Sequence, residues 1–214
     1  MTALKTFQKL SGAKQERIRR IAAEEFSEKG YARASINHIV SRLDIAKGSI
    51  FQYFGDKKGL FLFVFNSAME KGRDYLRTVR DQTGEEDLFT RLEASLLAGQ
   101  LFLQKHPVIY RLYIRIMFEY EIPFRDEILL SLREDSLKYL RSLLKNAKER
   151  GELREDTDPD KACFVIDAVM DRFLQAQVIP HLDAGLGISG SSEKEIRQWI
   201  SQIIDMLRMG IGQQ

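Results

Sequence analysis

Apolar residues recur with a period of about 3.6 along almost the whole chain, and this spacing predicts helices from end to end. No stretch shows the sustained alternation of β-branched and polar residues that half-buried strands need. The expected helices cover about residues 14–29, 35–43 and 47–54, a long helix from Asp56 through Val79, 86–105, and then helices from Pro107, from Pro123 to Gly151, from Pro159 to about Val178 and from Ser192. The pattern therefore predicts an all-α protein of about nine helices, with small helices first and longer ones after them.

Residues at several expected helix ends have the chemistry of caps. Asp56 precedes the long helix, and Asp158 and Pro159 combine an N-cap side chain with a proline in the first turn. Ser192 and Glu195 have the spacing of a capping box. These signals support the helix starts that the periodicity indicates.

Composition excludes several classes of protein. The 214 residues include 44% hydrophobic and 30% charged side chains, which is enough apolar material for a core and too little charge for a disordered chain. A single cysteine excludes an internal disulfide or a Cys-cluster zinc site and indicates a reducing compartment. The longest apolar runs, such as residues 60–65, are far shorter than the roughly 20 residues that span a bilayer, and the N-terminus lacks a signal peptide's apolar segment. We therefore expect a soluble cytoplasmic protein without a membrane partner.

The charge is distributed unevenly. Residues 1–60 contain 12 Lys and Arg against 6 Asp and Glu, whereas the whole chain has a net charge of only +2. A basic first quarter joined to a slightly acidic remainder indicates that the first part meets a polyanion.

The stretch from Gly30, the expected stop of the first helix, to Leu60 is the most informative part of the sequence. Its two short helices are joined by residues 44–46, a link of the length that a helix-turn-helix requires. Apolar side chains in this stretch can pack on Ile21 and Phe26 of the preceding helix: Ile39, Val40, Leu43, Ile45, Ile50 and Phe54.

The exposed face of the second short helix carries no acidic side chain. It presents Lys47, Gly48, Ser49, Gln52 and Tyr53. Ser49 and Gln52 can hydrogen-bond base edges, and Gly48 allows the backbone to approach a phosphate. This face is expected to enter a groove of DNA, although a packed three-helix unit with solvated polar residues would show the same pattern.

Three flanking residues are expected to contact phosphates. Ser35 is placed at a helix N-terminus, where free amides favour an anion. Lys57 lies in the first turn of the long helix, and His38 falls on the outward face of the first short helix. For His38, plain solvation is the alternative.

These residues carry a family resemblance. Gly30-Tyr31, Ser35-Ile36, Ile39-Val40, the run from Ile45 to Phe54 (IAKGSIFQYF) and Asp56-Lys57-Lys58 followed by Leu60 resemble the N-terminal domain of TetR-family transcriptional regulators over about residues 14–64. Gln52-Tyr53 departs from the Tyr-His that family members often carry, which concerns the target sequence and not the fold.

The resemblance implies a function and a division of the chain. A helix-turn-helix DNA-binding domain would occupy residues 1–55, with the motif itself over about 35–54, and an effector-binding and dimerisation domain would occupy 56–214. The protein would then be a homodimeric regulator, a repressor released from double-stranded operator DNA by a small-molecule effector.

Residues 96–124 are dense in aromatic side chains, and the resemblance implies a ligand pocket in the central helices. The expected pocket residues are Phe102, Tyr110, Tyr113, Met117, Phe118, Leu137 and Phe173. Their chemistry favours an apolar or aromatic effector. Aromatic residues at helical spacing also fill ordinary cores, so a solid core is the alternative.

The last helix and the helix from Pro159 carry apolar residues around more of their circumference than one core contact needs. This pattern and the resemblance predict a two-fold dimer interface. The expected interface residues are Val165, Val169, Trp199, Ile200, Ile203 and Leu207. Burial of both helices within one subunit is the alternative.

Catalysis has little support. His38, His106 and His181 lie in separate segments, and the adjacent carboxylates Glu24 and Glu25 fall at positions expected to be solvated. Gly185, Gly187 and Gly190 have dinucleotide-loop spacing but follow a helix, so we expect a flexible loop. We expect no catalytic residues, metal or cofactor. The alternatives are a helical protein that binds a small molecule or a protein partner but not DNA and, more remotely, an enzyme.

Overall fold

The computed structural model describes residues 6–213, apart from the side chain of residue 135. The helices named within this range are α2 (Gly12–Arg33), α3 (Ile36–Leu43), α4 (Lys47–Phe54), α5 (Lys57–Gln82), α6 (Leu88–Lys105), α7 (Pro107–Phe118), α8 (Arg125–Glu149), α9 (Pro159–Ala176) and α10 (Glu193–Ile211). The all-α prediction is confirmed. None of the helices in the described range is long and apolar enough to cross a membrane.

The expected caps form. The Asp56 carboxylate accepts a hydrogen bond from the Gly59 amide at 2.6 Å, at the start of α5. Asp158 caps α9 by accepting from two backbone amides, and Ser192 and Glu195 form the capping box of α10. Each cap pairs amides that the first helical turn would otherwise leave without partners.

Gly30 interrupts α2 where the sequence predicts a stop. Its φ of 71° and ψ of 170° break the helix into two segments joined by a kink. A side chain at this φ would be strained, and a Cβ here would lie 2.5 Å from Oε2 of Glu119. Glycine therefore lets the chain turn toward α3 while α7 packs closely against α2.

The chain divides into two compact units. The first unit runs through Arg73 and also contains His106–Asp126, so α7 packs with the helix-turn-helix. The second unit contains Asp74–Lys105 and the chain from Glu127 onward. The helix α5 therefore contributes its first part to one unit and its last part to the other.

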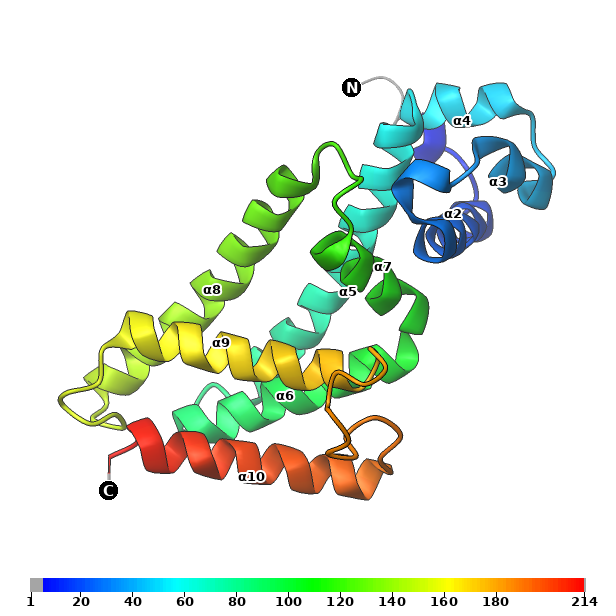
Figure 1. Ribbon diagram of the computed structural model, residues 1–214. Helices are drawn as coiled ribbons and strands as arrows, with labels where there is room; N and C mark the ends of the chain where they lie inside the picture. The colour runs from blue at the N-terminus through cyan, green and yellow to red at the C-terminus, as the bar shows by residue number, and fades with distance from the viewer. Residues whose placement is uncertain (1–5, 214) are drawn as a thin grey trace. The chain divides into compact units, whose positions relative to one another are not determined.

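Interlocking apolar side chains fill the first unit. Figure 1 shows α3 and α4 beside α2, and the buried residues of these helices include Ile21, Phe26, Ile39, Ile50 and Phe54. The predicted packing of the helix-turn-helix is therefore confirmed.

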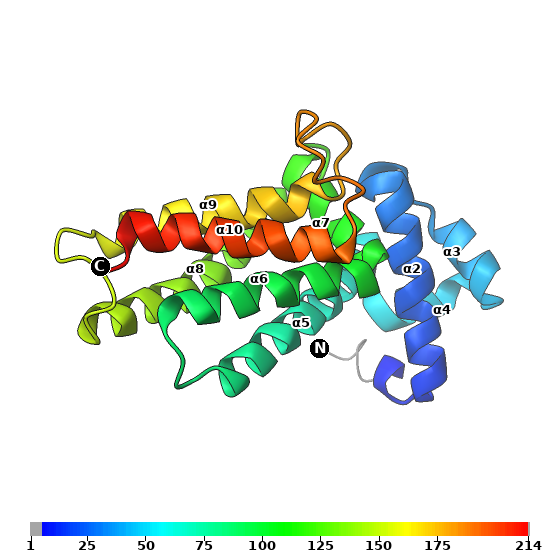
Figure 2. The same cartoon turned by 90° about the horizontal axis from the view of Figure 1, so that it is seen from below.

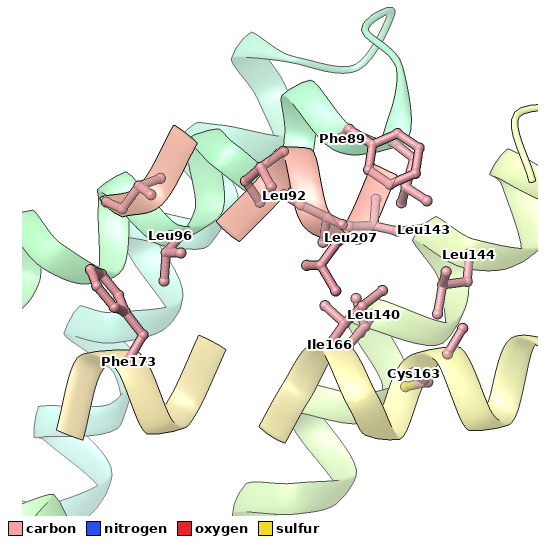
Figure 3. Close-up of a cluster of buried hydrophobic side chains, with 14 of the residues drawn as sticks. Phe89, Leu92, Leu96, Leu140, Leu143, Leu144, Cys163, Ile166, Phe173 and Leu207 are labelled. Atoms are coloured by element: carbon pink, nitrogen blue, oxygen red, sulfur yellow. The ribbon is translucent and has the colours of Figure 1, made fainter. Parts of the chain in front are cut away.

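The second unit has its own hydrophobic core. Figures 1 and 2 show α6, α9 and α10 side by side, and Figure 3 shows side chains from these helices and α8 meeting between them. Leu96 of α6, Leu144 of α8, Ile166 of α9 and Ile200 of α10 are fully buried there. Cys163 is a small core residue in the same cluster.

An ion-pair network crosses from α8 to α9. Arg133 contacts Asp167 at 3.0 Å and Asp171 at 2.8 Å. Burial and the neighbouring Asp171 raise the pKa of Asp167, although Arg133 opposes the shift. Asp171 thus forms an interhelical ion pair, whereas its neighbour Arg172 donates to the Leu182 carbonyl.

Candidate DNA-binding interface

The turn between α3 and α4 is fixed by its backbone. Asp44 adopts a left-handed conformation with φ of 55° and ψ of 52°, a region in which Asp is tolerated better than most residues. The Ile45 amide then donates to the Val40 carbonyl at 3.2 Å. These features set the direction of α4 relative to α3, so that Ile50 and Phe54 face the core and the opposite face of α4 is free.

The free face of α4 matches the prediction in most positions. Lys47, Gly48 and Gln52 are exposed, and Ser49 and Tyr53 are half-buried. A Cβ built at Gly48 meets no atom within 4 Å, so its backbone is open to approach by a ligand. No acidic side chain occurs in α4. The arrangement can accept a polyanion without charge repulsion from its own helix.

Phe7 is a core residue that the sequence pattern did not reveal. It is 1% exposed, and its ring centroid lies 5.1 Å from that of Phe54 and 4.7 Å from that of Phe63. Its ring also meets the edge of Tyr53, and the Arg19 guanidinium lies over its face. The residues before α2 therefore brace the end of α4. A lone aromatic residue outside any periodic segment gave no signal of this.

Glu25 corrects an expectation. Glu24 and Glu25 were both expected to be solvated, yet Glu25 is only 2% exposed. One carboxylate oxygen accepts from the Ser35 amide at 2.9 Å, and the other lies 2.5 Å from Nδ1 of His38. The spacing of Ile18, Ile21 and Glu25 along one helical face is the signal that could have shown this burial.

The Glu25 carboxylate ties α2 to the start of α3. Burial raises the pKa of Glu25, but the hydrogen bonds from the Ser35 amide and His38, with the positive charges nearby, bring that pKa below its ordinary value of 4.5. Ser35 also caps α3 by accepting from the His38 amide at 3.3 Å. His38 keeps about half of its side chain exposed. Ser35 and His38 are thus positioned by a buried charge.

Lys57 has contacts within its own unit. Its Nζ donates to the Ala32 carbonyl at 2.9 Å and lies 5.0 Å from the centroid of the Tyr31 ring. Burial lowers the pKa of Lys57, and the charge of Glu25 opposes this shift. A phosphate contact by Lys57 stays a prediction, and such a contact would have to compete with the Ala32 carbonyl.

The expected pocket residues fall in both units. Tyr110, Tyr113, Met117 and Phe118 lie on α7 in the first unit, where Tyr110 is buried and Phe118 is 52% exposed. The other three belong to the second unit: Phe102, Leu137 and Phe173. Phe173 is buried in the hydrophobic core there, and Leu137 packs against that core.

The expected interface residues also separate into two groups. Ile200 and Leu207 are buried in the core of the second unit. Val165 is exposed and Val169 is half-buried on α9. Trp199 and Ile203 are half-buried and pack against the core.

Comparisons with known proteins point to the same helix-turn-helix residues. A family model described as bacterial regulatory proteins of the tetR family matches residues 18–64, which include α3 and α4. A solved TetR-family regulator from Chloroflexus aurantiacus is 28% identical, covers 98% of each chain and gives a TM-score of 0.74. Residues 18–64 thus match the DNA-binding domain of the TetR family, and the whole chain has the fold of a TetR-family regulator.

The curated relatives that match this chain are described as transcriptional regulators. The HTH-type transcriptional regulator YvdT of Bacillus subtilis is 30% identical over 46% of this chain and 50% of its own length. A protein described as a probable acrEF/envCD operon repressor of Escherichia coli is 24% identical over 72% of this chain and 71% of its own. The chain spans about half the length of the first curated relatives it matches, YvdT and YuxN of Bacillus subtilis.

Proposed function

We propose that this chain is a transcriptional repressor that binds operator DNA as a homodimer and is released by a small-molecule effector. The observation that carries the proposal is the acid-free face of α4, with Lys47, Gly48 and Gln52 exposed on a helix whose opposite face is buried in the core. A relative named as an operon repressor supports the direction of regulation.

The test is direct binding to DNA. Duplex DNA from upstream of the protein's own gene, labelled with a fluorophore, is titrated with the full chain and followed by fluorescence anisotropy. Lys47→Ala should weaken binding on all sequences and reduce the dependence of log affinity on log salt by about one unit per lost phosphate contact. Lys145→Ala, which removes an exposed lysine of α8, is the matched control and should leave both quantities unchanged. Equal behaviour of the two variants would contradict a DNA-binding role for α4.

Base recognition is a separate step of the proposal. Gln52 is exposed on α4 and can make a bidentate contact to adenine in the major groove. Gln52→Ala should therefore cost about 1–3 kcal/mol at the preferred site and little on random DNA. Equal losses on both DNAs would show that Gln52 contributes only to general affinity.

The proposed dimer uses the side chains that the fold leaves exposed on α9 and α10. Phe164 is 73% exposed and Val165 lies beside it, while Met206 and Met209 are each 66% exposed. A contiguous exposed apolar patch on a folded chain often marks a contact with another protein. A two-fold dimer would also present two copies of α4, which must lie about 34–36 Å apart to enter successive major grooves.

A route for effector control lies in α7. The Arg115 guanidinium donates to the carbonyl oxygens of Ser27 and Glu28, the latter at 2.7 Å, and pairs with Glu119. These carbonyls belong to the end of α2 just before its kink, so a displacement of α7 must carry α2 with it or break charge-assisted hydrogen bonds. An effector that shifts α7 would then change the spacing of the two α4 helices without touching DNA.

A further inference from the structure

A groove of about 540 Å³ opens in the second unit, and its lining residues do not include any residue of α7. It lies between the last part of α5, one face of α6 and the start of α10. Its apolar lining includes Tyr75 and Val79 of α5, Leu97 and Leu101 of α6, and Ile196 of α10. The volume is within the range of small-molecule sites, about 300–1,000 Å³.

Gln100 supplies the polar feature of this groove. The side chain lines the groove and is only 8% exposed. Its Oε1 atom is buried and accepts no hydrogen bond from any residue that the structure describes. A buried amide oxygen without a partner costs free energy, and a small rotation of the Gln100 side chain toward the groove would let an N–H or O–H group of a ligand supply that partner.

The charged side chains that line the groove do not favour an ionic ligand. Asp74 pairs with Arg77 at 2.7 Å, and Glu193 pairs with Arg197 at 2.9 Å. Lys105 is exposed at the end of α6. With two acidic and two basic side chains along the groove, the formal charges balance.

We propose that this groove binds an uncharged, mostly apolar small molecule that donates a hydrogen bond to Gln100. The inference rests on the proposed effector response and gives it a location and a ligand chemistry. It places the ligand on α5, α6 and α10, with no contribution from the α7 residues that the aromatic pattern favours.

The position of the groove suits control of the first unit. The chain passes from the first unit to the second at Arg73–Asp74 and returns at Lys105–His106. Asp74 and Lys105 both line the groove. A ligand there contacts the end of α6 that leads directly into α7, the helix that carries Arg115.

N-phenyl-1-naphthylamine is a suitable probe because it is uncharged and apolar, has one N–H donor and fluoresces more strongly in apolar surroundings. Titration into the full-length protein should show saturable binding. Ala98→Phe places a ring in the groove from α6 and should abolish this binding, whereas Ala13→Phe, which adds the same side chain to an exposed position at the start of α2, should not.

Gln100→Leu tests the hydrogen bond. The substitution should weaken the binding of N-phenyl-1-naphthylamine by up to about tenfold. The compound 1-phenylnaphthalene lacks the N–H group, and its binding is measured by displacement of the first probe. It should bind to the variant as well as to the wild type, or better. The variant should also melt at a higher temperature without ligand, because the unpartnered amide is gone. That result shows that it is folded.

The results of these experiments distinguish a failure of the groove as a binding site from a failure of the proposed repressor function. Absence of saturable binding, binding that survives Ala98→Phe in a folded protein, or equal losses for both probes in Gln100→Leu would each overturn the groove as a site. If the probe binds as expected but the protein binds no DNA, the groove is supported and the repressor function fails.

Discussion

Glu25→Gln should destabilise the protein in a pH-dependent way. The substitution keeps an oxygen that can accept from the Ser35 amide at 2.9 Å but removes the negative charge facing His38 at 2.5 Å. A hydrogen bond to a charged group contributes about 1.5–3 kcal/mol, and a carboxylate that is only 2% exposed is little screened by water. We therefore expect the free energy of unfolding near neutral pH to fall by about 1.5–3 kcal/mol.

The sign of the pH dependence follows from the lowered pKa. Burial opposes the shift, but the hydrogen bonds from Ser35 and His38 prevail and hold the pKa of Glu25 below 4.5 in the folded protein. The stability that the carboxylate contributes is complete above 4.5, its ordinary value, and is lost as the pH falls through the folded-state pKa. The difference between wild type and Glu25→Gln should thus close in acid.

Urea unfolding followed by circular dichroism, near pH 7 and near pH 3, measures this difference. Hydrogen exchange at the Ser35 amide adds a local reading, since protection there depends on the Glu25 carboxylate. Glu28→Gln, which changes an exposed glutamate of the same helix, is the control and should stay within about 0.5 kcal/mol of wild type. Equal losses for both variants, or a difference that persists undiminished in acid, would refute the assignment of Glu25 as a buried charged brace.

Three further outcomes are expected. Phe7→Ala should lower the free energy of unfolding, measured by denaturant titration, by about 3–5 kcal/mol, because it empties a fully buried site. Phe51→Ala is the control and should cost far less, because Phe51 is half-exposed. Lys57→Ala should reduce the salt slope of DNA binding by about one unit; an unchanged slope would mean that its ammonium stays on the Ala32 carbonyl. Phe164→Glu should give a folded monomer in sedimentation, with weakened operator binding. Ile200→Glu should instead unfold the second unit, because Ile200 is fully buried. A Phe164→Glu protein that stays dimeric would exclude α9 from the interface.

The helices, their caps and the helix-turn-helix could be predicted from the amino-acid sequence. These features depend on residues three or four positions apart, such as Ser192 and Glu195, or on a single residue such as Gly30. Local spacing was therefore enough to predict α3, α4 and the exposed face of α4. The family resemblance rests on the same short stretch, which the family model also matches.

Which of two similar residues is buried, and which residues it contacts, depends on contacts between segments that are distant in the chain. Glu24 and Glu25 are neighbours in sequence, yet Glu25 alone is enclosed, because Ser35 and His38 reach it from ten and thirteen positions away. The apolar sides of α10 looked equivalent along the helix, but the packing of α6, α8 and α9 buries Ile200 and leaves Met206 exposed. The packing of α7 against α2, the enclosure of Phe7 and the groove at Gln100 likewise join segments that are distant in the chain. Periodicity reports which face of one helix is apolar, whereas the partner of that face depends on how the chain closes on itself.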